Sequence, residues 1–222
     1  MGSASAARSR KSTPARKGSG RRPYFWIAIG VVLVLFAAAL VMSRSDTQNG
    51  SPSTAAGVEE MRAVSVTGDA LPQFGEGEDA AVGQQIPVVQ GKSFDGGDVA
   101  ITNNGRPKVV ILLAHWCSHC QAEVPVVQDW IDSDGVPEGV DLFSVATSTD
   151  PGQGNYPPSA WLDREGWTVP VIADSPEYAA SEAFGLTAFP FFVFVNSDGT
   201  VAYRVSGRQT AAEIAQAISQ LN

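Results

Sequence analysis

The stretch VVILLAHWCSHC, residues 109–120, decides the fold of this chain. It begins with an unbroken apolar run, residues 109–114, of the kind that forms a central β-strand buried on both faces. It ends in Cys117 and Cys120, the only cysteines among the 222 residues, and a helix-like pattern follows them to about residue 131. The pair therefore lies at a strand-to-helix junction. There the positive end of the helix dipole stabilises a thiolate at Cys117, which predicts thiol–disulfide exchange.

Strand and helix patterns alternate around this junction, over residues 80–222. Strands are expected at residues 86–89, 99–101, 140–146, 169–173, 190–195 and 201–205, and helices at 159–166, 176–184 and 210–221. Gly-containing turns at 95–97 and 196–199 predict two hairpins. This order predicts an α/β domain with a mixed central sheet and helices on both faces.

A 19-residue apolar segment, YFWIAIGVVLVLFAAALVM, occupies residues 24–42. As a helix it would span about 28 Å, close to the hydrocarbon thickness of a bilayer. Seven Lys and Arg residues precede it, and aromatic residues stand at its start. These features predict a single transmembrane helix with a cytoplasmic N-terminus and an extracytoplasmic body. A cleaved signal peptide is the alternative; its apolar part is usually shorter, and it leads to the same compartment.

Charge divides the chain into a basic beginning and an acidic body. Residues 1–45 hold eight of the 15 Lys and Arg residues and no acid, while the other seven and all 23 acids follow, for a formal charge of −16. We interpret residues 1–23 as a disordered cytoplasmic tail and residues 43–79 as a flexible extracytoplasmic linker. Directly before a membrane span, the basic tail is a topology signal that contacts anionic lipid, so no nucleic-acid partner is expected.

The residues around the cysteine pair resemble the thioredoxin superfamily, and in particular its membrane-anchored TlpA/ResA-type branch. The apolar strand leads into Trp116-Cys117-x-x-Cys120, and residues 120–125 match the C-x-x-E-x-P continuation of that branch. Phe189-Pro190 opens an apolar strand at the place where the superfamily carries a cis-proline facing the cysteines. The resemblance covers residues 80–222.

This resemblance implies a thioredoxin-like domain that exchanges dithiol for disulfide with protein cysteines and needs no cofactor or metal. Cys117 would attack, Cys120 would resolve the mixed disulfide, and a membrane redox partner would supply or accept the electrons. Glu123 would move a proton to or from Cys120, since Ile111 replaces the acidic residue that thioredoxin uses for this purpose.

The direction of electron flow stays open. The branch resemblance favours a reductant, as in cytochrome c maturation. His119, directly before the second cysteine, resembles strongly oxidising DsbA-like proteins and would stabilise the Cys117 thiolate. Trp116, Phe189 and Pro190 are expected to form the substrate-docking surface, whereas His115 is expected to be a rim residue without a catalytic role.

Other functions for the cysteine pair remain as alternatives. A disulfide across so short a loop adds little stability, which argues against a purely structural bond. Zinc would need a second pair of ligands, and covalent haem would need His where the chain has Gln121. A copper-carrying protein and a non-catalytic binding module in which the pair is a passive switch stay open.

Overall fold

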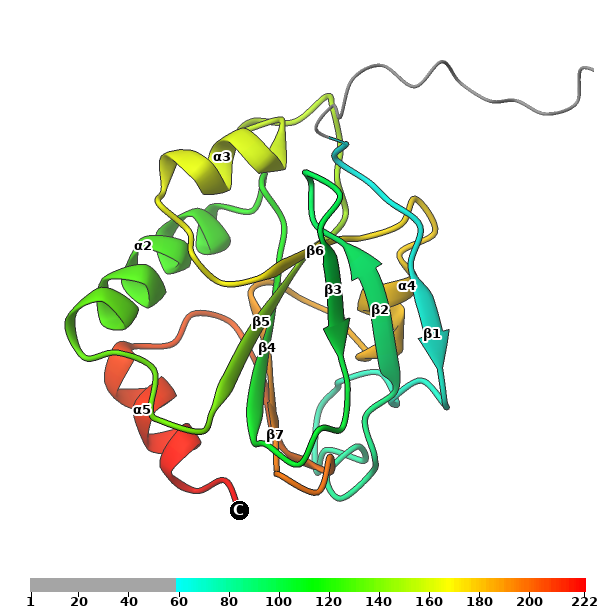
Figure 1. Ribbon diagram of the computed structural model, residues 1–222, viewed down its shortest axis with the longest axis vertical. Helices are drawn as coiled ribbons and strands as arrows, with labels where there is room; N and C mark the ends of the chain where they lie inside the picture. Colours follow the sequence, from blue (N-terminus) through cyan, green and yellow to red (C-terminus); the bar gives the residue numbers. More distant parts are fainter. Residues whose placement is uncertain (1–58) are drawn as a thin grey trace, which may run out of the picture. The chain divides into compact units, whose positions relative to one another are not determined.

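The computed structural model describes residues 59–222, whose centre is a five-stranded mixed sheet (Figure 1). Its strands lie in the order β6-β5-β4-β7-β8. They span Val171–Ala173 (β6), Asp141–Ala146 (β5), Lys108–Leu113 (β4), Phe191–Val195 (β7) and Val201–Ser206 (β8). β4 and β5 are parallel, as are β5 and β6, while β7 is antiparallel to both β4 and β8.

The apolar run before the cysteines forms the central strand, as predicted. All six residues of β4 are buried, because strands flank it on both edges and side chains cover it on both faces. β4 and β5 run upward in Figure 1, so their carboxyl ends and the start of the next helix lie at the upper end of the sheet. This end carries the cysteine pair.

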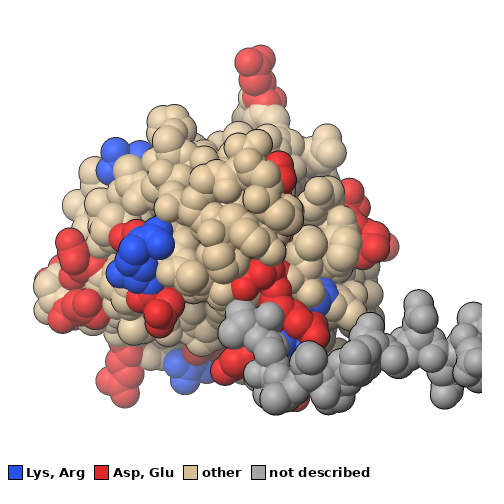
Figure 2. Space-filling view, turned by 90° about the horizontal axis from the view of Figure 1, so that it is seen from above, with Lys and Arg blue, Asp and Glu red and all other residues tan. Residues whose placement is uncertain are grey.

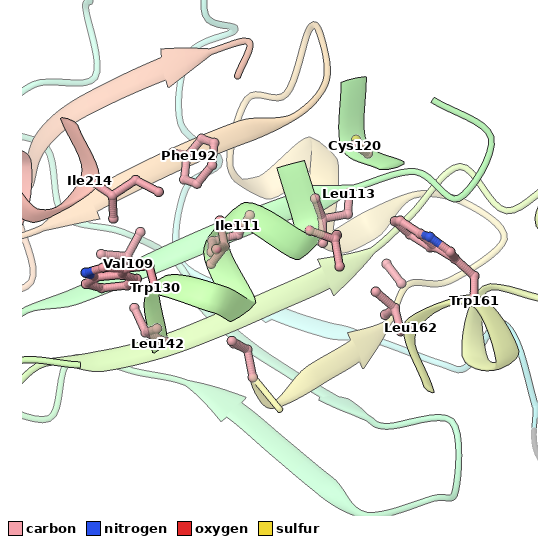
Figure 3. Close-up of a cluster of buried hydrophobic side chains, with 14 of the residues drawn as sticks. Val109, Ile111, Leu113, Cys120, Trp130, Leu142, Trp161, Leu162, Phe192 and Ile214 are labelled. Carbon is pink, nitrogen blue, oxygen red and sulfur yellow. The ribbon is translucent and has the colours of Figure 1, made fainter. Parts of the chain in front are cut away.

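Helices cover both faces of the sheet, which confirms the predicted α/β architecture. The helices are α2 (Ser118–Ser133), α3 (Pro158–Arg164), α4 (Ala179–Ala183) and α5 (Ala211–Ser219). Side chains of α2, α3 and α5 share one core cluster with β4, β5 and β7 (Figure 3). The opposite face packs against α4 and a second, antiparallel sheet of β1 (Ser65–Thr67), β2 (Val88–Lys92) and β3 (Asp98–Ile101).

The expected flexible linker does not extend to residue 79. Residues 59–79 belong to the folded unit: β1 pairs with β2, and Asp79 binds the fully buried Arg204 of β8 through two hydrogen bonds. The Pro72 carbonyl accepts a third bond from Arg204. The sequence prediction was wrong here because these contacts are tertiary, and those with Arg204 join residues more than 100 positions apart, which composition does not register.

Helix α4 begins later than the sequence predicts. The expected start was Pro176, but Tyr178 adopts a left-handed conformation with φ of 61° and the helix follows it. The buried Asp174 carboxylate accepts hydrogen bonds from the backbone N–H groups of Ala180 and Ser181, and so fixes the helix start from the preceding strand end. This arrangement leaves Tyr178 exposed.

The first turn of helix α3 donates hydrogen bonds to a residue that lies outside the helix. The Glu60 carboxylate accepts bonds from the Ser159 backbone N–H at 2.9 Å and from its hydroxyl. Pro157 stands at the cap position of this helix and makes no side-chain bond. The charge of Glu60 also favours the positive end of the helix.

Replacing Glu60 by Ala should therefore lower the free energy of unfolding by about 1 kcal/mol, the usual cost of a lost helix cap. Urea unfolding of the full chain measures the change. Glu76→Ala is the matched control, because Glu76 is exposed and lies in a bend outside the helices and strands. Equal stability of the two variants would show that the Glu60 contact contributes nothing.

The predicted transmembrane segment, residues 24–42, and the basic tail lie outside the described residues. Among residues 59–222, no helix has both the length and the apolar character to cross a bilayer.

Candidate active site

Cys117 and Cys120 occupy the amino-terminal end of α2, as the sequence predicts. Cys117 is the cap residue of this 16-residue helix, and its carbonyl accepts the Gln121 N–H at 3.0 Å. Both cysteines are free thiols. Cys117 is partly exposed, whereas Cys120 is fully buried and lies beside Leu113 (Figure 3). An incoming sulfur atom therefore meets Cys117 first, where the helix dipole favours a negative charge.

The buried Cys120 thiol is held in its protonated form. Burial raises the pKa of Cys120 well above its usual range, and the neighbouring Cys117 and Glu123 raise it further. One contact opposes this shift, the hydrogen bond that Cys120 Sγ accepts from the Ala114 N–H at 3.5 Å. Cys120 thus needs a base before it can attack a disulfide.

Glu123 lies one helical turn after Cys120 and is completely buried. The backbone N–H of Gln209 donates to Glu123 Oε1 at 2.9 Å, and Arg208 Nε lies 3.5 Å from Oε2, which accepts no hydrogen bond. Burial raises the pKa of Glu123, while the Gln209 amide and the Arg208 guanidinium act in the opposite direction. A buried carboxyl with a raised pKa keeps its proton to a higher pH than an exposed glutamate does, which suits it to proton exchange with a thiol.

Sequence reasoning missed Arg208 and Gln209. They follow β8 and meet α2 only because α5 and the end of β8 pack beside it. No spacing in the sequence relates them to residues 117–123. The one available signal was Glu123 itself, because a carboxyl that becomes buried requires hydrogen-bond donors or a cation nearby.

Trp116, directly before Cys117, meets Phe189, directly before Pro190, across the fold. The Phe189–Pro190 peptide bond is cis, and the rings of Trp116 and Phe189 meet edge to face with their centroids 5.8 Å apart. Cys117 and Phe189 pack against the core cluster that contains Cys120. Trp116 remains 38% exposed, so an aromatic surface borders the reactive thiol.

His115 is not the rim residue that the sequence suggested. It is buried, its Nε2 accepts the backbone N–H of Asp150 at 3.1 Å, and its Nδ1 lies 2.8 Å from the Gly154 carbonyl oxygen. Since Nε2 accepts, Nδ1 carries the proton and donates it to Gly154. Trp116 Nε1 likewise donates to the Ser148 carbonyl at 2.7 Å. The two residues before Cys117 therefore fix the loop that follows β5.

His119 is exposed, and its side chain makes no hydrogen bond or ion pair with any part of residues 59–222. Its proposed effect on the Cys117 thiolate stays a prediction. The described part of the chain holds no group of three or more His, Cys, Asp and Glu side chains arranged for a metal ion. A metal ion bound at this site would be coordinated by the sulfur atoms of the two cysteines.

Comparison with known proteins agrees with this geometry. Residues 81–219 match the Redoxin family. No curated protein matches the chain. Among solved structures, MTB dsbF, determined in mixed oxidised and reduced forms, is 27% identical over 60% of this chain and 94% of its own, with a TM-score of 0.50.

Two further structures share the fold at lower identity. StoA from Bacillus subtilis is 20% identical over 62% of this chain and 98% of its own, with a TM-score of 0.51. A DsbF homologue from Corynebacterium diphtheriae is 17% identical over 78% of this chain and 98% of its own, with a TM-score of 0.52. The chain thus belongs to the Redoxin family and, with a Cys-x-x-Cys pair at the start of α2, is a thiol–disulfide oxidoreductase of the thioredoxin fold.

Proposed function

We propose that this oxidoreductase is a membrane-tethered reductant of protein disulfides, of the TlpA/ResA type, that works on the extracytoplasmic side. The observation that carries the exchange chemistry is the buried Glu123 carboxyl, one turn after Cys120 and held by Gln209 and Arg208. It supplies what a reductant needs at Cys120, namely a base that frees the resolving thiol. The reducing direction follows the TlpA/ResA resemblance, since a proton carrier serves both directions of the exchange. His119, the residue that favours an oxidant, is solvent-exposed.

The reaction begins at Cys117. Its thiolate attacks one sulfur of a substrate disulfide, so a Cys117–substrate bond forms and the other substrate sulfur leaves as a thiolate. Trp116 and the Phe189–Pro190 turn border the sulfur that is attacked and exclude water from one side of it.

Cys120 completes the transfer. The Glu123 carboxylate accepts the Cys120 proton, and the resulting thiolate attacks Cys117 Sγ, which releases the second substrate sulfur. The substrate gains two electrons, and the protein is left with a Cys117–Cys120 disulfide. A dithiol donor of the membrane must then reduce this bond.

The tether rests on the apolar segment at residues 24–42 and on the seven positive charges before it. An anchored domain acts within reach of membrane donors and of proteins exported beside it. Cytochrome c maturation, which the branch resemblance implies, is the process that we propose it serves. Resistance of the full chain to alkaline extraction from membranes, with digestion of the body by external protease, tests the tether.

The reduction potential of the full-length protein tests the direction. We expect a value near or below about −250 mV, in the range of reducing thioredoxin-fold proteins, measured by thiol alkylation in dithiol buffers. A value between about −120 and −180 mV would place it with oxidants and isomerases instead. Measuring His119→Ala in parallel shows whether the exposed histidine contributes to the potential.

A further inference from the structure

A pocket of about 460 Å³ adjoins the redox site and plays no part in the chemistry of the thiols. Trp116 forms one wall, the Ser148–Gln153 loop forms another, and Tyr178 closes the third side. Trp116 is thus shared between this pocket and the reactive Cys117 beside it. A polypeptide whose disulfide has reached Cys117 therefore has this pocket within reach of its neighbouring residues.

The loop is fixed in place by the redox motif itself. His115 binds Asp150 and Gly154, and Trp116 binds Ser148, so both residues before Cys117 hold the pocket wall. A wall held in this way keeps one shape while substrates come and go, which favours selective binding.

Backbone strain is concentrated around the same pocket. Within residues 59–222, the non-glycine residues with positive φ are Ser148, Asn155 and Tyr178. Ser148 and Tyr178 line the pocket, and Asn155 ends the loop that His115 holds. A left-handed tyrosine is costly, and such residues cluster where binding requires them. Tyr178 is also 44% exposed, so its ring is open to an incoming ligand.

The lining suits a cationic side chain with an apolar stem. Two aromatic side chains, Trp116 and Tyr178, are among its lining residues, and rings of this type bind Lys and Arg; Asp150 adds a carboxylate to the lining. No basic residue lines the pocket. Arg164 reaches the loop at Asn155 only, and it is paired with Glu165. Figure 2, which looks down on this end of the sheet, shows a largely uncharged middle with acidic side chains at several places around it and basic side chains on one side.

We propose that this pocket is a docking site for the substrate polypeptide and receives a Lys or Arg side chain that neighbours the reacting cysteine. The proposal rests on the protein-disulfide reductase function above and adds a preference among its substrates. Affinity comes from the aromatic walls and from Asp150, and register comes from the short distance along the chain between the basic residue and the cysteine.

Peptides joined to glutathione through a single cysteine test the preference. They differ only in the residues on either side of the cysteine, which are Lys, Ala or Glu. With the full-length protein, we expect kcat/KM to be about fivefold higher for Lys than for Glu, as for a favourable exposed ion pair. Asp150→Asn, which retains an oxygen for the Gly152 N–H, should remove most of that preference.

Tyr178→Asn tests the aromatic wall, because Asn tolerates the left-handed conformation. It should lower kcat/KM about fivefold for Lys peptides and leave the rate with a small aromatic disulfide, dithiobis(nitrobenzoate), unchanged. Tyr203→Asn is the matched control, since Tyr203 is 48% exposed but lies on β8 beside α5.

The outcomes separate this inference from the function on which it rests. Equal rates for Lys and Glu peptides, or equal effects of the two tyrosine variants, would overturn the docking site while the reductase stands. A Tyr178 variant that slows the small disulfide as much as the peptides would assign Tyr178 a structural role and also overturn it. Failure of the unaltered protein to reduce any disulfide would overturn the proposed function.

Discussion

Replacing Cys117 by Ser abolishes disulfide reduction, by a factor on the order of 10³ or more, because it removes the only partly exposed thiol at the start of α2. Cys120 does not take over the attack. It is fully buried, and burial raises the pKa of its thiol, so it remains protonated and shielded from substrate. Reduction of glutathione-linked peptides, followed by thiol release, measures the loss.

Cys120→Ser is the companion variant and should behave differently. It can still form the first bond, so a stable mixed disulfide between Cys117 and the substrate accumulates with one equivalent of released thiol. Mass spectrometry under non-reducing conditions identifies this species. Absence of disulfide reduction in the unaltered protein, with partner binding kept in Cys117→Ser, would instead support the passive-switch module. Stoichiometric Cu(I) that is lost in Cys120→Ser would support a copper carrier.

The parts of the fold that the sequence predicted are those that local patterns determine. Residues 109–120 combine an apolar strand with a cysteine pair, and the strand must be central to bury both of its faces. Thr210 and Glu213 form the capping box that starts α5, close to where the helix pattern begins. Phe189-Pro190 was found through the resemblance, since X-Pro bonds in general are seldom cis.

Apart from the late start of α4, which Asp174 sets from six residues away, the missed features depend on contacts between distant residues. Glu60 caps a helix 99 positions away, Arg204 binds Asp79 across 125 positions, and Arg208 reaches Glu123 across 85. His115 illustrates the same limit, because its burial follows from the loop that folds over it. Which buried polar group meets which partner is decided by tertiary packing, and a single sequence does not contain that pairing.

Glu123→Gln should slow reduction by about 100-fold at neutral pH, the lower end of what a positioned acid or base contributes. The amide keeps an oxygen for the Gln209 N–H but accepts no proton from Cys120. In the unaltered protein, the rate of resolution should rise with pH as Glu123 ionises, with a midpoint above the ordinary glutamate value. The variant should lack this rise. Asp129→Asn, on the exposed side of α2, is the matched control.

Arg208→Gln tests the environment of the same carboxyl. The charged and titratable groups around Glu123 are Cys120 on its own helix, Arg208 after β8 and Glu213 on α5. Loss of the Arg208 cation should move the midpoint of the pH profile upward, by a modest amount because Arg208 is half exposed. In the Glu123→Gln background the same change should have no effect on the profile. An equal shift in both backgrounds would mean that Arg208 acts elsewhere.

The stability of Glu123→Gln is a second test of this residue. It should rise where the activity of the variant falls. Burial raises the pKa of Glu123 in the folded state, so the folded protein holds this proton more tightly than the unfolded chain. Its contribution to stability is therefore greatest at low pH and is lost as the pH rises through the folded-state pKa. Gln does not ionise, so Glu123→Gln should gain stability relative to the unaltered protein between acidic and neutral pH, measured by urea unfolding. A variant that is both slower and more stable at neutral pH identifies a carboxyl kept buried for proton transfer, whereas one that loses stability there would identify an ion pair kept for the fold.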